Sequence, residues 1–346
     1  MSAGTALRPL RLGTRASMLA LAQSGNVADA LSLHAARDVQ LVHISTQGDR
    51  DRSTPTAQLG STGVYVSALR DALLAGEIDF AVHSYKDLPT APAEGLTIAA
   101  VPVRADPRDA LISRDGLTLE KLPAGARVGT GAVRRIAQLL ATRPDLSCVP
   151  IRGNIDTRMG KVTSGELDAV VLAAAGLNRI GRGMQITEAL DPEIMLPAPA
   201  QGALAVECRV DDLGLAELLA GLDDLGTRAE VTAERALLAA LEAGCSAPVA
   251  AHARAVLGPQ AIELTLRARV VALDGSAALT DGRTITVYEP FSTSGLLAGQ
   301  ASSAGVGRKE FTHPYDSLHT DAEAVGRQLA ADLLANGADT LMGRTA

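Results

Sequence analysis

Cys245 is the residue whose local sequence best suits covalent chemistry. It follows Gly244 and lies three positions before Pro248, so we expect a turn that leaves its thiol accessible. The other cysteines, Cys148 and Cys208, lie in or beside apolar runs, where we expect inert packing residues. No spacing among the three is typical of a metal site or a disulfide. From these residues alone, a reactive thiol and a simple free thiol both remain open for Cys245.

Basic side chains cluster where predicted strands and helices meet. These residues are Arg15, Arg134, Arg135, Arg152, Arg158 and Arg179. Gly153 follows Arg152 at a predicted helix start, where glycine allows close backbone approach and the helix N-terminus favours anions. Arg134 and Arg135 fall in the first turn of another predicted helix, where a cation opposes the helix dipole. The set indicates an anion-binding cleft; the alternative is arginines that are solvated or paired with Asp and Glu.

The segment His83 to Asp87 follows a predicted buried strand. Ligands of open α/β sheets bind beyond the carboxyl ends of the strands, so Lys86 and Asp87 are candidate site residues. The alternative is a structural ion pair between these two side chains. Asp87 becomes a catalytic candidate only if it faces the arginine-lined cleft.

Composition restricts the class of protein. Of the 346 residues, 47% are hydrophobic, which excludes a disordered chain, and 21% are charged, which excludes a membrane-spanning one. The first residues lack the apolar core of a signal peptide, and we expect a cytoplasmic protein. A net charge of −7 with no Trp, three Phe and four Tyr disfavours a nucleic-acid-binding surface.

Strands and helices alternate twice along the first two thirds of the chain, which predicts two α/β lobes. The predicted strands are 10–14, 39–44, 78–82, 110–113, 127–129, 148–151, 169–172 and 204–208. The predicted helices are one capped by Ser17 and those at 64–75, 133–142 and 155–163. The segments 76–82 and 165–171 are similar in sequence, and each opens a strand after a helix, which supports a duplicated architecture. The strand at 204–208 is expected to return to the first lobe.

The pattern changes from residue 227 and predicts a separate α+β domain. Its predicted elements are a helix to about Ala243, strands at 262–271 and 284–288, and a helix at 321–336, with a Gly- and Ser-rich loop at 292–307. We therefore divide the chain into a first lobe (1–103 and 203–224), a second lobe (104–202) and a C-terminal domain (225–346).

Seven motifs, in their order and spacing, resemble those of hydroxymethylbilane synthases, also called porphobilinogen deaminases. They are Leu12–Ser17, Val82–Asp87, Asp106–Asp109, Arg152–Asn154 with Thr157 and Arg158, Ala174–Leu177 with Arg179, Gln201–Gly202, and Gly244–Cys245. The resemblance implies two lobes with mixed sheets of the periplasmic-binding-protein type and a smaller C-terminal α+β domain. It implies a transferase that condenses four porphobilinogen molecules, with loss of ammonia, onto a dipyrromethane cofactor. Hydrolysis then releases linear hydroxymethylbilane for tetrapyrrole (haem, chlorophyll or cobalamin) biosynthesis.

The resemblance also implies a role for each matched residue. Cys245 carries the dipyrromethane through a thioether, and Asp87 is the catalytic residue. The implied cofactor-binding residues are Arg15, Ser17, Lys86, Arg134, Arg135, Arg152, Gly153, Arg158 and Arg179. Arginine suits this role because each pyrrole brings two carboxylates, which a guanidinium can bind in a bidentate way. The partners are porphobilinogen and the growing chain; we expect no metal, nucleic acid or membrane, and a monomer.

The chain departs from the family pattern at four positions. Thr62 stands where many relatives have a lysine, and Gly131 and Ala132 stand where relatives often have hydroxyl residues. These changes remove side chains that donate to anions. Tyr85 replaces a more usual aliphatic residue or Met. The stretch 281–317 is assigned no function.

Two other functions explain part of the pattern. A non-enzymatic solute-binding protein with two lobes explains the arginine cleft but neither the third domain nor Cys245. A transferase that acts on another small carboxylate through Lys86 as nucleophile explains the cleft as well. Mass mapping of a covalent group to Cys245, to Lys86 or to neither separates the three functions.

Overall fold

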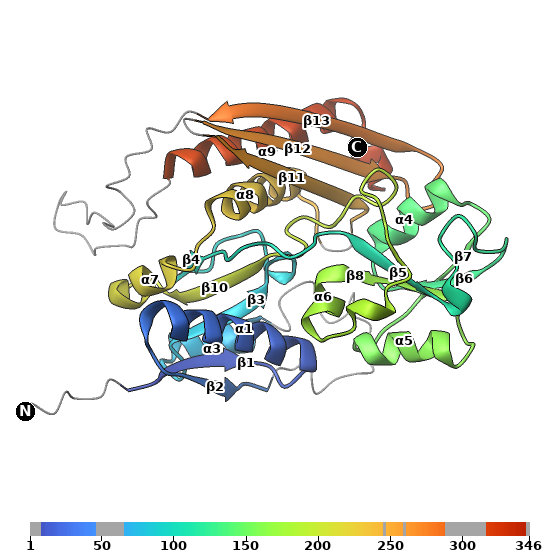
Figure 1. Ribbon diagram of the computed structural model, residues 1–346. Helices are drawn as coiled ribbons and strands as arrows, with labels where there is room; N and C mark the ends of the chain where they lie inside the picture. The colour runs from blue at the N-terminus through green and yellow to red at the C-terminus, as the bar shows by residue number, and fades with distance from the viewer. Residues whose placement is uncertain (1–7, 46–65, 245–246, 259–260, 288–315, 344–346) are drawn as a thin grey trace, which may run out of the picture.

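The computed structural model describes residues 8–45, 66–244, 247–258, 261–287 and 316–343 (Figure 1). Its strands form two five-stranded sheets and one three-stranded sheet. Helices accompany each sheet, and the two larger sheets are mixed. The predicted fold class, two α/β lobes with mixed sheets and a smaller C-terminal α+β domain, is confirmed. The residues at which we divided the chain into domains stay a prediction.

The first lobe is built on a sheet in which β10 has returned from the second lobe. Across the sheet the strands are β2 (Val39–His43), β1 (Leu10–Thr14), β3 (Phe80–Ser84), β10 (Leu204–Arg209) and β4 (Leu96–Ala100). Its helices are α1 (Met18–Ala35), α3 (Ser67–Leu74), α7 (Leu213–Ala220) and the 3₁₀ turn η1 (Tyr85–Asp87). β1 is parallel to β2 and β3, whereas β10 is antiparallel to β3 and β4. The predicted return of strand 204–208 is confirmed.

The second lobe has a sheet of the same kind. Across the sheet the strands are β7 (Ser147–Pro150), β6 (Arg127–Thr130), β8 (Ala169–Ala173), β5 (Asp109–Ser113) and β9 (Glu188–Ala189). Its helices are α4 (Val133–Thr142), α5 (Ile155–Thr163), α6 (Ala174–Arg179) and the 3₁₀ turns η2 (Arg114–Gly116) and η3 (Gly183–Gln185). The central strand β8 is apolar and buried, as expected of a strand with both faces covered.

The sheets of the two lobes repeat one arrangement of strand directions, position for position. In each sheet the second strand is parallel to the first and the third, and the fourth strand is antiparallel to both of its neighbours. Polar contacts repeat as well: Asp79 accepts from the backbone N–H of Arg11 at 2.8 Å, and Asp168 accepts from that of Arg127 at 2.8 Å. Both aspartates belong to the similar segments 76–82 and 165–171, so the duplicated architecture is confirmed.

The C-terminal domain is an antiparallel sheet covered on one face by two long helices. Its elements are β11 (Val249–Leu257), β12 (Ile262–Val271), β13 (Ala278–Val287), α8 (Leu225–Ala240), α9 (Asp316–Ala335) and α10 (Ala338–Leu341). Leu237 of α8, Leu329 of α9 and Leu264 of β12 are fully buried in one apolar cluster between the layers. Figure 1 places this domain above both lobes.

Glu234 of α8 joins the C-terminal domain to both segments that connect the lobes. Its side chain has no exposed surface. One carboxylate oxygen accepts from Arg104 at 2.8 Å and from the N–H of Ala253 at 2.7 Å, and the other accepts from Arg104 at 3.0 Å and from the N–H of Ala200 at 2.5 Å. Arg104 and Ala200 lie on the two connecting segments, so one carboxylate holds both connections against α8.

Candidate active site

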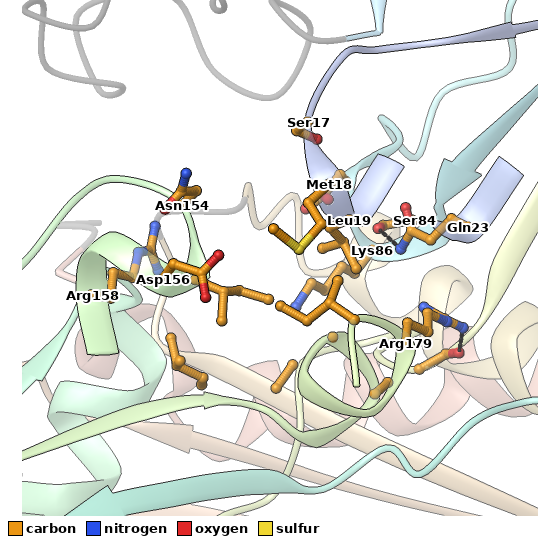
Figure 2. A pocket seen from close by; sticks show the side chains of 18 of the residues that line it. Ser17, Met18, Leu19, Gln23, Ser84, Lys86, Asn154, Asp156, Arg158 and Arg179 are labelled. Atoms are coloured by element: carbon orange, nitrogen blue, oxygen red, sulfur yellow. Dashed lines mark hydrogen bonds between the residues drawn. The ribbon is translucent and has the colours of Figure 1, made fainter. Parts of the chain in front are cut away.

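A cavity of 290 Å³ lies between the two lobes (Figure 2). Its walls come from α1 and η1 of the first lobe and from α5 and α6 of the second. Figure 2 shows Met18 and Leu19 on one side and Asn154, Asp156 and Arg158 on the opposite side. The predicted site residues that line this interlobe cavity are Ser17, Lys86, Asp87, Arg135, Gly153, Arg158 and Arg179.

A second cavity, of 330 Å³, lies where the lobes meet the C-terminal domain. The predicted site residues that line it are Lys86, Asp87, Arg134, Arg135 and Arg158. Gly244 and Ala247 also line it, whereas Cys245 lies outside the described residues. Because Lys86, Asp87, Arg135 and Arg158 line both cavities, the two cavities adjoin at these side chains.

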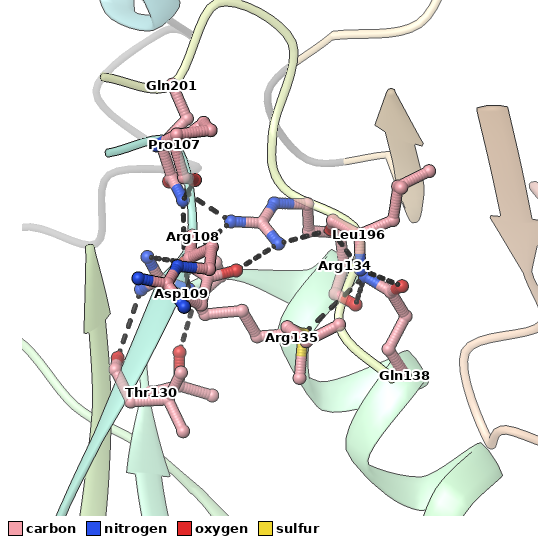
Figure 3. Close-up of polar contacts among 12 residues, drawn as sticks. Pro107, Arg108, Asp109, Thr130, Arg134, Arg135, Gln138, Leu196 and Gln201 are labelled. Carbon is pink, nitrogen blue, oxygen red and sulfur yellow. Dashed lines mark hydrogen bonds and ion pairs between the residues drawn. The ribbon is translucent and has the colours of Figure 1, made fainter. Parts of the chain in front are cut away.

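Asp109 of β5 holds the two arginines at the start of α4 (Figure 3). Arg134 donates to both carboxylate oxygens, at 2.6 and 3.1 Å. Arg135 donates to Oδ1 from Nε at 3.0 Å and from Nη2 at 2.7 Å. All three side chains are buried. The carboxylate therefore offsets the unfavourable position of two cations in the first turn of a helix.

This Asp109 cluster keeps a net positive charge inside the protein. Burial by itself raises the pKa of Asp109, but the charges and hydrogen bonds of Arg134 and Arg135 outweigh that effect and hold the pKa well below its usual range. The aspartate therefore stays ionised, and two guanidinium groups face one carboxylate. An arginine has five N–H donors, and Arg134 already uses four of its own here. Arg135 uses three, two to Asp109 and one to the carbonyl of Val171, and therefore has more capacity for an anionic ligand than Arg134.

Gln201 links the Asp109 cluster to Lys86. Its Oε1 accepts from Lys86 Nζ at 3.1 Å and from Arg134 at 3.2 Å. Its Nε2 donates to Asp109 and to the carbonyl of Pro107, both at 2.8 Å. The side chain is fully buried, and both amide hydrogens and both oxygen lone pairs are used. Gln201 thus fixes a residue of the first lobe against residues of the second.

Lys86 and Asp87 lie on η1, directly after the carboxyl end of β3. Lys86 is half-buried, and burial is the main reason that its pKa falls to about 8. The nearby Asp87 opposes this decrease, while Arg135 adds to it. Asp87 itself is exposed and lines both cavities, so it does face the arginine-lined cleft.

The start of α5 depends on two residues of the Arg152–Asn154 motif. Gly153 has a φ of +104°, and a Cβ there would lie 2.8 Å from a methyl carbon of Thr157. Asn154 caps the helix by accepting from the N–H of Thr157 at 2.8 Å. Arg158, one turn further on, donates from Nε to the carbonyl of Gly153 at 2.8 Å and lines both cavities.

Four other predicted residues differ in their relation to the cavities. Ser17 caps α1 by accepting from the N–H of Ala20 at 3.3 Å. Arg179 donates to the carbonyl of Gly202 at 2.6 Å; burial lowers its pKa to about 10, which leaves it charged at neutral pH. Arg15 and Arg152 line neither of these two cavities, although Arg152 adjoins Gly153, which does.

Several residues of the site were missed in the sequence. Gln23 and Ser84 line the interlobe cavity, and Gln23 Nε2 donates to Ser84 Oγ at 2.8 Å. A signal for Gln23 existed: it lies four residues from Leu19 and from Val27, in the middle of an otherwise apolar helix face. Asp109 and Gln201 stood in recognised motifs, but their links to arginines and to Lys86 had no local signal.

The departures from the family pattern have different local settings. A Cβ on Gly131 would lie 2.8 Å from the backbone oxygen of Ile151, so a side chain does not fit there without a shift. Ala132 is the N-cap of α4 and supplies no side-chain cap. Thr62 lies outside the described residues.

Helix α8 ends before the proposed cofactor cysteine in a turn made without glycine. The sequence predicted a helix to about Ala243, whereas α8 ends at Ala240. Glu242 has a φ of +48°, and the N–H of Ala243 donates to the carbonyl of Leu238 at 3.1 Å, which is a Schellman motif. The chain leaves the helix at this turn and reaches Gly244 on the wall of the second cavity.

The two described cysteines are poor nucleophiles. Cys208 has no exposed surface, and burial is the main cause that raises the pKa of its thiol to about 12. Burial also raises the pKa of Cys148. Because the thiolate is the reactive form, both thiols should be less reactive at neutral pH than an ordinary cysteine, in line with the prediction of packing residues.

Family models match nearly the whole chain. The model described as "Porphobilinogen deaminase, dipyromethane cofactor binding domain" matches residues 10–217, and "Porphobilinogen deaminase, C-terminal domain" matches residues 228–335. The chain belongs to the porphobilinogen deaminase family. The resemblance inferred from the seven motifs is therefore confirmed.

Relatives in the porphobilinogen deaminase family are similar over their full length. Porphobilinogen deaminase 1 of Streptomyces coelicolor is 54% identical over 344 residues, covering 98% of this chain and 99% of the relative. Porphobilinogen deaminase of Thermobifida fusca is 53% identical over 339 residues, covering 98% and 97%. An ancestral cationic amino acid solute-binding protein matches 62% of this chain and 87% of its own, at 16% identity and a TM-score of 0.38.

Two further properties concern the described residues only. Among them, no helix combines the length and the apolar composition needed to cross a bilayer. Nor do three or more His, Cys, Asp or Glu side chains come together there as a metal site. The cytoplasmic location and the monomeric state stay predictions.

Proposed function

We propose that the interlobe cavity and the second cavity form one active site, with dipyrromethane attached to Cys245 by a thioether and Asp87 as the catalytic residue. As a porphobilinogen deaminase, the protein is a transferase that condenses porphobilinogen molecules stepwise, with loss of ammonia, into linear hydroxymethylbilane. One observation carries the assignment of the site. Asp87 lines both cavities, and the second cavity extends to Gly244 and Ala247, on either side of the Cys245 segment.

The side chains around the two cavities suit a dipyrromethane. Each of its pyrroles carries an acetate and a propionate, so the group is a polyanion. Lys86, Arg158 and the Asp109 cluster place an excess of positive charge where the cavities adjoin. Guanidinium groups bind carboxylates in a planar, bidentate way and keep their charge when buried. The residues present therefore fit the cofactor, which when bound supplies the pyrrole carbon to which substrate is joined.

We assign the cationic residues to binding. Lys86, Arg135 and Arg158 are suited to hold cofactor carboxylates, since they line both cavities. Arg179 and the start of α5 at Gly153 line only the interlobe cavity, and we assign them to the carboxylates of substrate or of the growing chain. Arg15 and Arg152 keep their assignment as cofactor-binding residues from the family resemblance alone.

We assign Asp87 to the stabilisation of positive charge. Departure of ammonia from porphobilinogen leaves a cationic pyrrole, and a fixed carboxylate stabilises charge that develops during a reaction. The same oxygens can accept hydrogen bonds from pyrrole N–H groups and so orient the ring. Asp87 is exposed to both cavities, so it is accessible to a substrate in one and to a cofactor in the other.

Intact mass spectrometry tests the attachment. We expect the active protein to be heavier than its sequence by one dipyrromethane, and Cys245→Ala to have the bare mass and no activity. Cys148→Ala and Cys208→Ala are matched controls that should keep the added mass, because burial raises the pKa of both thiols and so disfavours the reactive thiolate. Full activity in a protein of bare mass, or added mass retained in Cys245→Ala, contradicts the proposal.

A further inference from the structure

Arg235 of α8 contacts the back of the turn that carries Lys86 and Asp87. Its Nη1 donates to the carbonyls of Tyr85 at 3.2 Å and Leu88 at 3.1 Å, and its Nη2 donates to the carbonyl of Pro89 at 2.6 Å. These carbonyls belong to η1 and to the residues just after it. One guanidinium from the C-terminal domain therefore holds the backbone on both sides of Asp87.

Tyr85 adds a second contact between the same two elements. The guanidinium carbon of Arg235 lies 4.5 Å from the centroid of the Tyr85 ring, a cation–π arrangement. Tyr85 also packs against two apolar clusters, one that contains Leu88 and one that contains Ala200. An aliphatic residue or Met, the more usual choice in this family, offers no π face to an arginine.

Tyr85 and Arg235 lie next to the proposed active site but do not line it. Neither Tyr85 nor Arg235 lines the interlobe cavity or the second cavity. Both line a different cavity, of 1020 Å³, behind η1 and between the first lobe and the helices α8 and α9. Among the described residues, η1 therefore borders this cavity on the side away from the active site, and Tyr85 and Arg235 connect η1 to α8 there.

Helix α8 connects this bridge to the proposed cofactor cysteine. Arg235 precedes the end of α8 by five residues, and the chain then passes through the Glu242 turn to Gly244. Glu234, adjacent to Arg235, fixes the same helix to both segments that connect the lobes. The position of η1 is therefore set relative to the helix that leads to Cys245.

We infer that Tyr85 and Arg235 are positioning residues that hold Asp87 relative to the cofactor arm. The inference rests on the proposed function, since it assumes that Asp87 acts on a pyrrole attached at Cys245. A shift of the turn moves Asp87 without removing any side chain from the cavity walls. Displacements of about 1 Å can reduce rates by about a hundredfold. The pair should therefore govern kcat much more than the KM for porphobilinogen.

The test compares variants of the cofactor-loaded enzyme. Arg235→Gln removes the charge and the fork of donors, and we expect kcat to fall between about tenfold and a hundredfold while KM changes less than about twofold. Arg235→Lys keeps a cation and should recover part of kcat. Tyr85→Leu should lower kcat about threefold, whereas Tyr85→Phe, which keeps the ring, should match the wild type. Tyr85→Leu should have no further effect in the Arg235→Gln protein.

Intact mass and melting temperature, measured on the same samples, separate positioning from folding. The inference is wrong if Arg235→Gln and Tyr85→Leu both keep the wild-type kcat per cofactor-loaded molecule. It is also wrong if kcat falls only in proportion to the loss of bound cofactor or to the decrease in melting temperature. If Arg235→Gln does not fold, the same comparison of kcat is made with Arg235→Lys, Tyr85→Leu and Tyr85→Phe. Asp87→Asn, run in parallel, separates the two proposals. If Asp87→Asn is fully active, the proposal of Asp87 as the catalytic residue is contradicted. If Asp87→Asn is inactive while the Tyr85 and Arg235 variants keep the wild-type kcat, only the positioning role is contradicted.

Discussion

Two aspartates lie among the same arginines and have different roles. Asp109 is fully buried and accepts from Arg134 and Arg135, so its charge is used inside the protein. Asp87 is exposed to both cavities and is available to a ligand. The difference arises from position: Asp109 begins the inner strand β5, whereas Asp87 lies in the turn beyond the end of β3.

The variant Asp87→Asn tests the catalytic assignment. The substitution keeps the shape, removes the charge and turns one acceptor into a donor that faces pyrrole N–H groups. Loss of one preorganised electrostatic contact lowers turnover by about 10²–10³. We expect the variant to remain folded because the side chain is exposed. Single-turnover rate and melting temperature on one sample check this; early melting with a normal rate per folded molecule removes Asp87 from the mechanism.

Asp109→Asn is the matched control with the opposite expectation. It leaves two buried guanidinium groups without their carboxylate, and breaking a buried ion pair costs about 3–5 kcal/mol. Unfolding in urea should therefore begin at a much lower concentration than in the wild type or in Asp87→Asn. Equal unfolding midpoints for the two aspartate variants would contradict the division of roles.

The pKa of Lys86 predicts an alkaline limit to carboxylate binding. Its folded pKa of about 8 lies below the unfolded value of 10.5, so the side chain loses its charge as pH rises through about 8. Cofactor assembly by the Cys245-intact apoprotein should slow above that pH, and Lys86→Arg should remove this limit. The stability effect has the opposite sign: the cost of burying the charge is present below pH 8 and disappears as pH rises towards 10.5. An unchanged alkaline limit in Lys86→Arg contradicts the assignment.

At the scale of elements, comparison of the two lobes shows that Ala132 lacks the side-chain helix cap that its counterpart in the first lobe supplies. Ser17 and Ala132 occupy the same place, directly before the helix that follows the strand with two parallel neighbours, which is β1 in the first lobe and β6 in the second. Ser17 caps α1, whereas α4 has no side-chain cap. Ala132→Ser should therefore raise the free energy of unfolding by about 1 kcal/mol, and Ser17→Ala should lower it by a similar amount. Urea unfolding checks both.

Gly131→Ser is the control for that prediction, since it adds a hydroxyl one residue earlier. Its Cβ would meet the backbone oxygen of Ile151 at 2.8 Å, so we expect lower stability. If Ala132→Ser and Gly131→Ser change stability equally, capping is not the cause. The comparison therefore distinguishes a specific cap from a general effect of adding a polar group near α4.

The predictability of each element followed the strength of its local pattern. The bounds of α4, α5 and β12 were predicted as they are, because apolar periodicity between clear breakers defines them. β11 and α7 were not predicted: β11 is rich in alanine, which favours no strand, and α7 is apolar almost all round, which hides its period. β3 begins and ends two residues later than expected, because His83 and Ser84 pair with Ala205 and Leu204 of the neighbouring β10.

The site was predictable where residues follow strand ends and not where they join distant segments. Ser17, Lys86 and Gly153 lie just after the ends of β1, β3 and β7, and the sheets bring them to one cavity. The link from Gln201 to Lys86 spans 115 positions, and that from Gln201 to Asp109 spans 92. No local pattern indicates pairs at such separations. The pairing of Arg134 and Arg135 with Asp109 was the alternative left open in the sequence, and it coexists with their place on the cavity wall.

At the scale of the whole molecule, the C-terminal domain contacts three different parts of the chain. Arg235 holds the turn η1 of the first lobe, and Arg269 of β12 donates to the carbonyls of Glu193 and Ile194 in the second lobe. Glu234 holds the two connecting segments. The domain that carries Cys245 is thus placed relative to both walls of the cleft and to the connection between them.

Glu234→Gln tests how much that connection contributes. The substitution removes the negative charge that pairs with the buried Arg104. It also alters a carboxylate that accepts hydrogen bonds from two backbone N–H groups. Removing one partner of a buried ion pair lowers stability by about 3–5 kcal/mol. Glu230→Gln is the matched control: Glu230 also pairs with Arg104, at 3.1 Å, and accepts from one backbone N–H, that of Ala255 at 3.0 Å, but it is partly exposed, at 16%. We expect a much larger decrease in unfolding midpoint for Glu234→Gln. An equal decrease in both variants would mean that the charge of Arg104 alone, and not the link to Ala200 and Ala253, stabilises the junction.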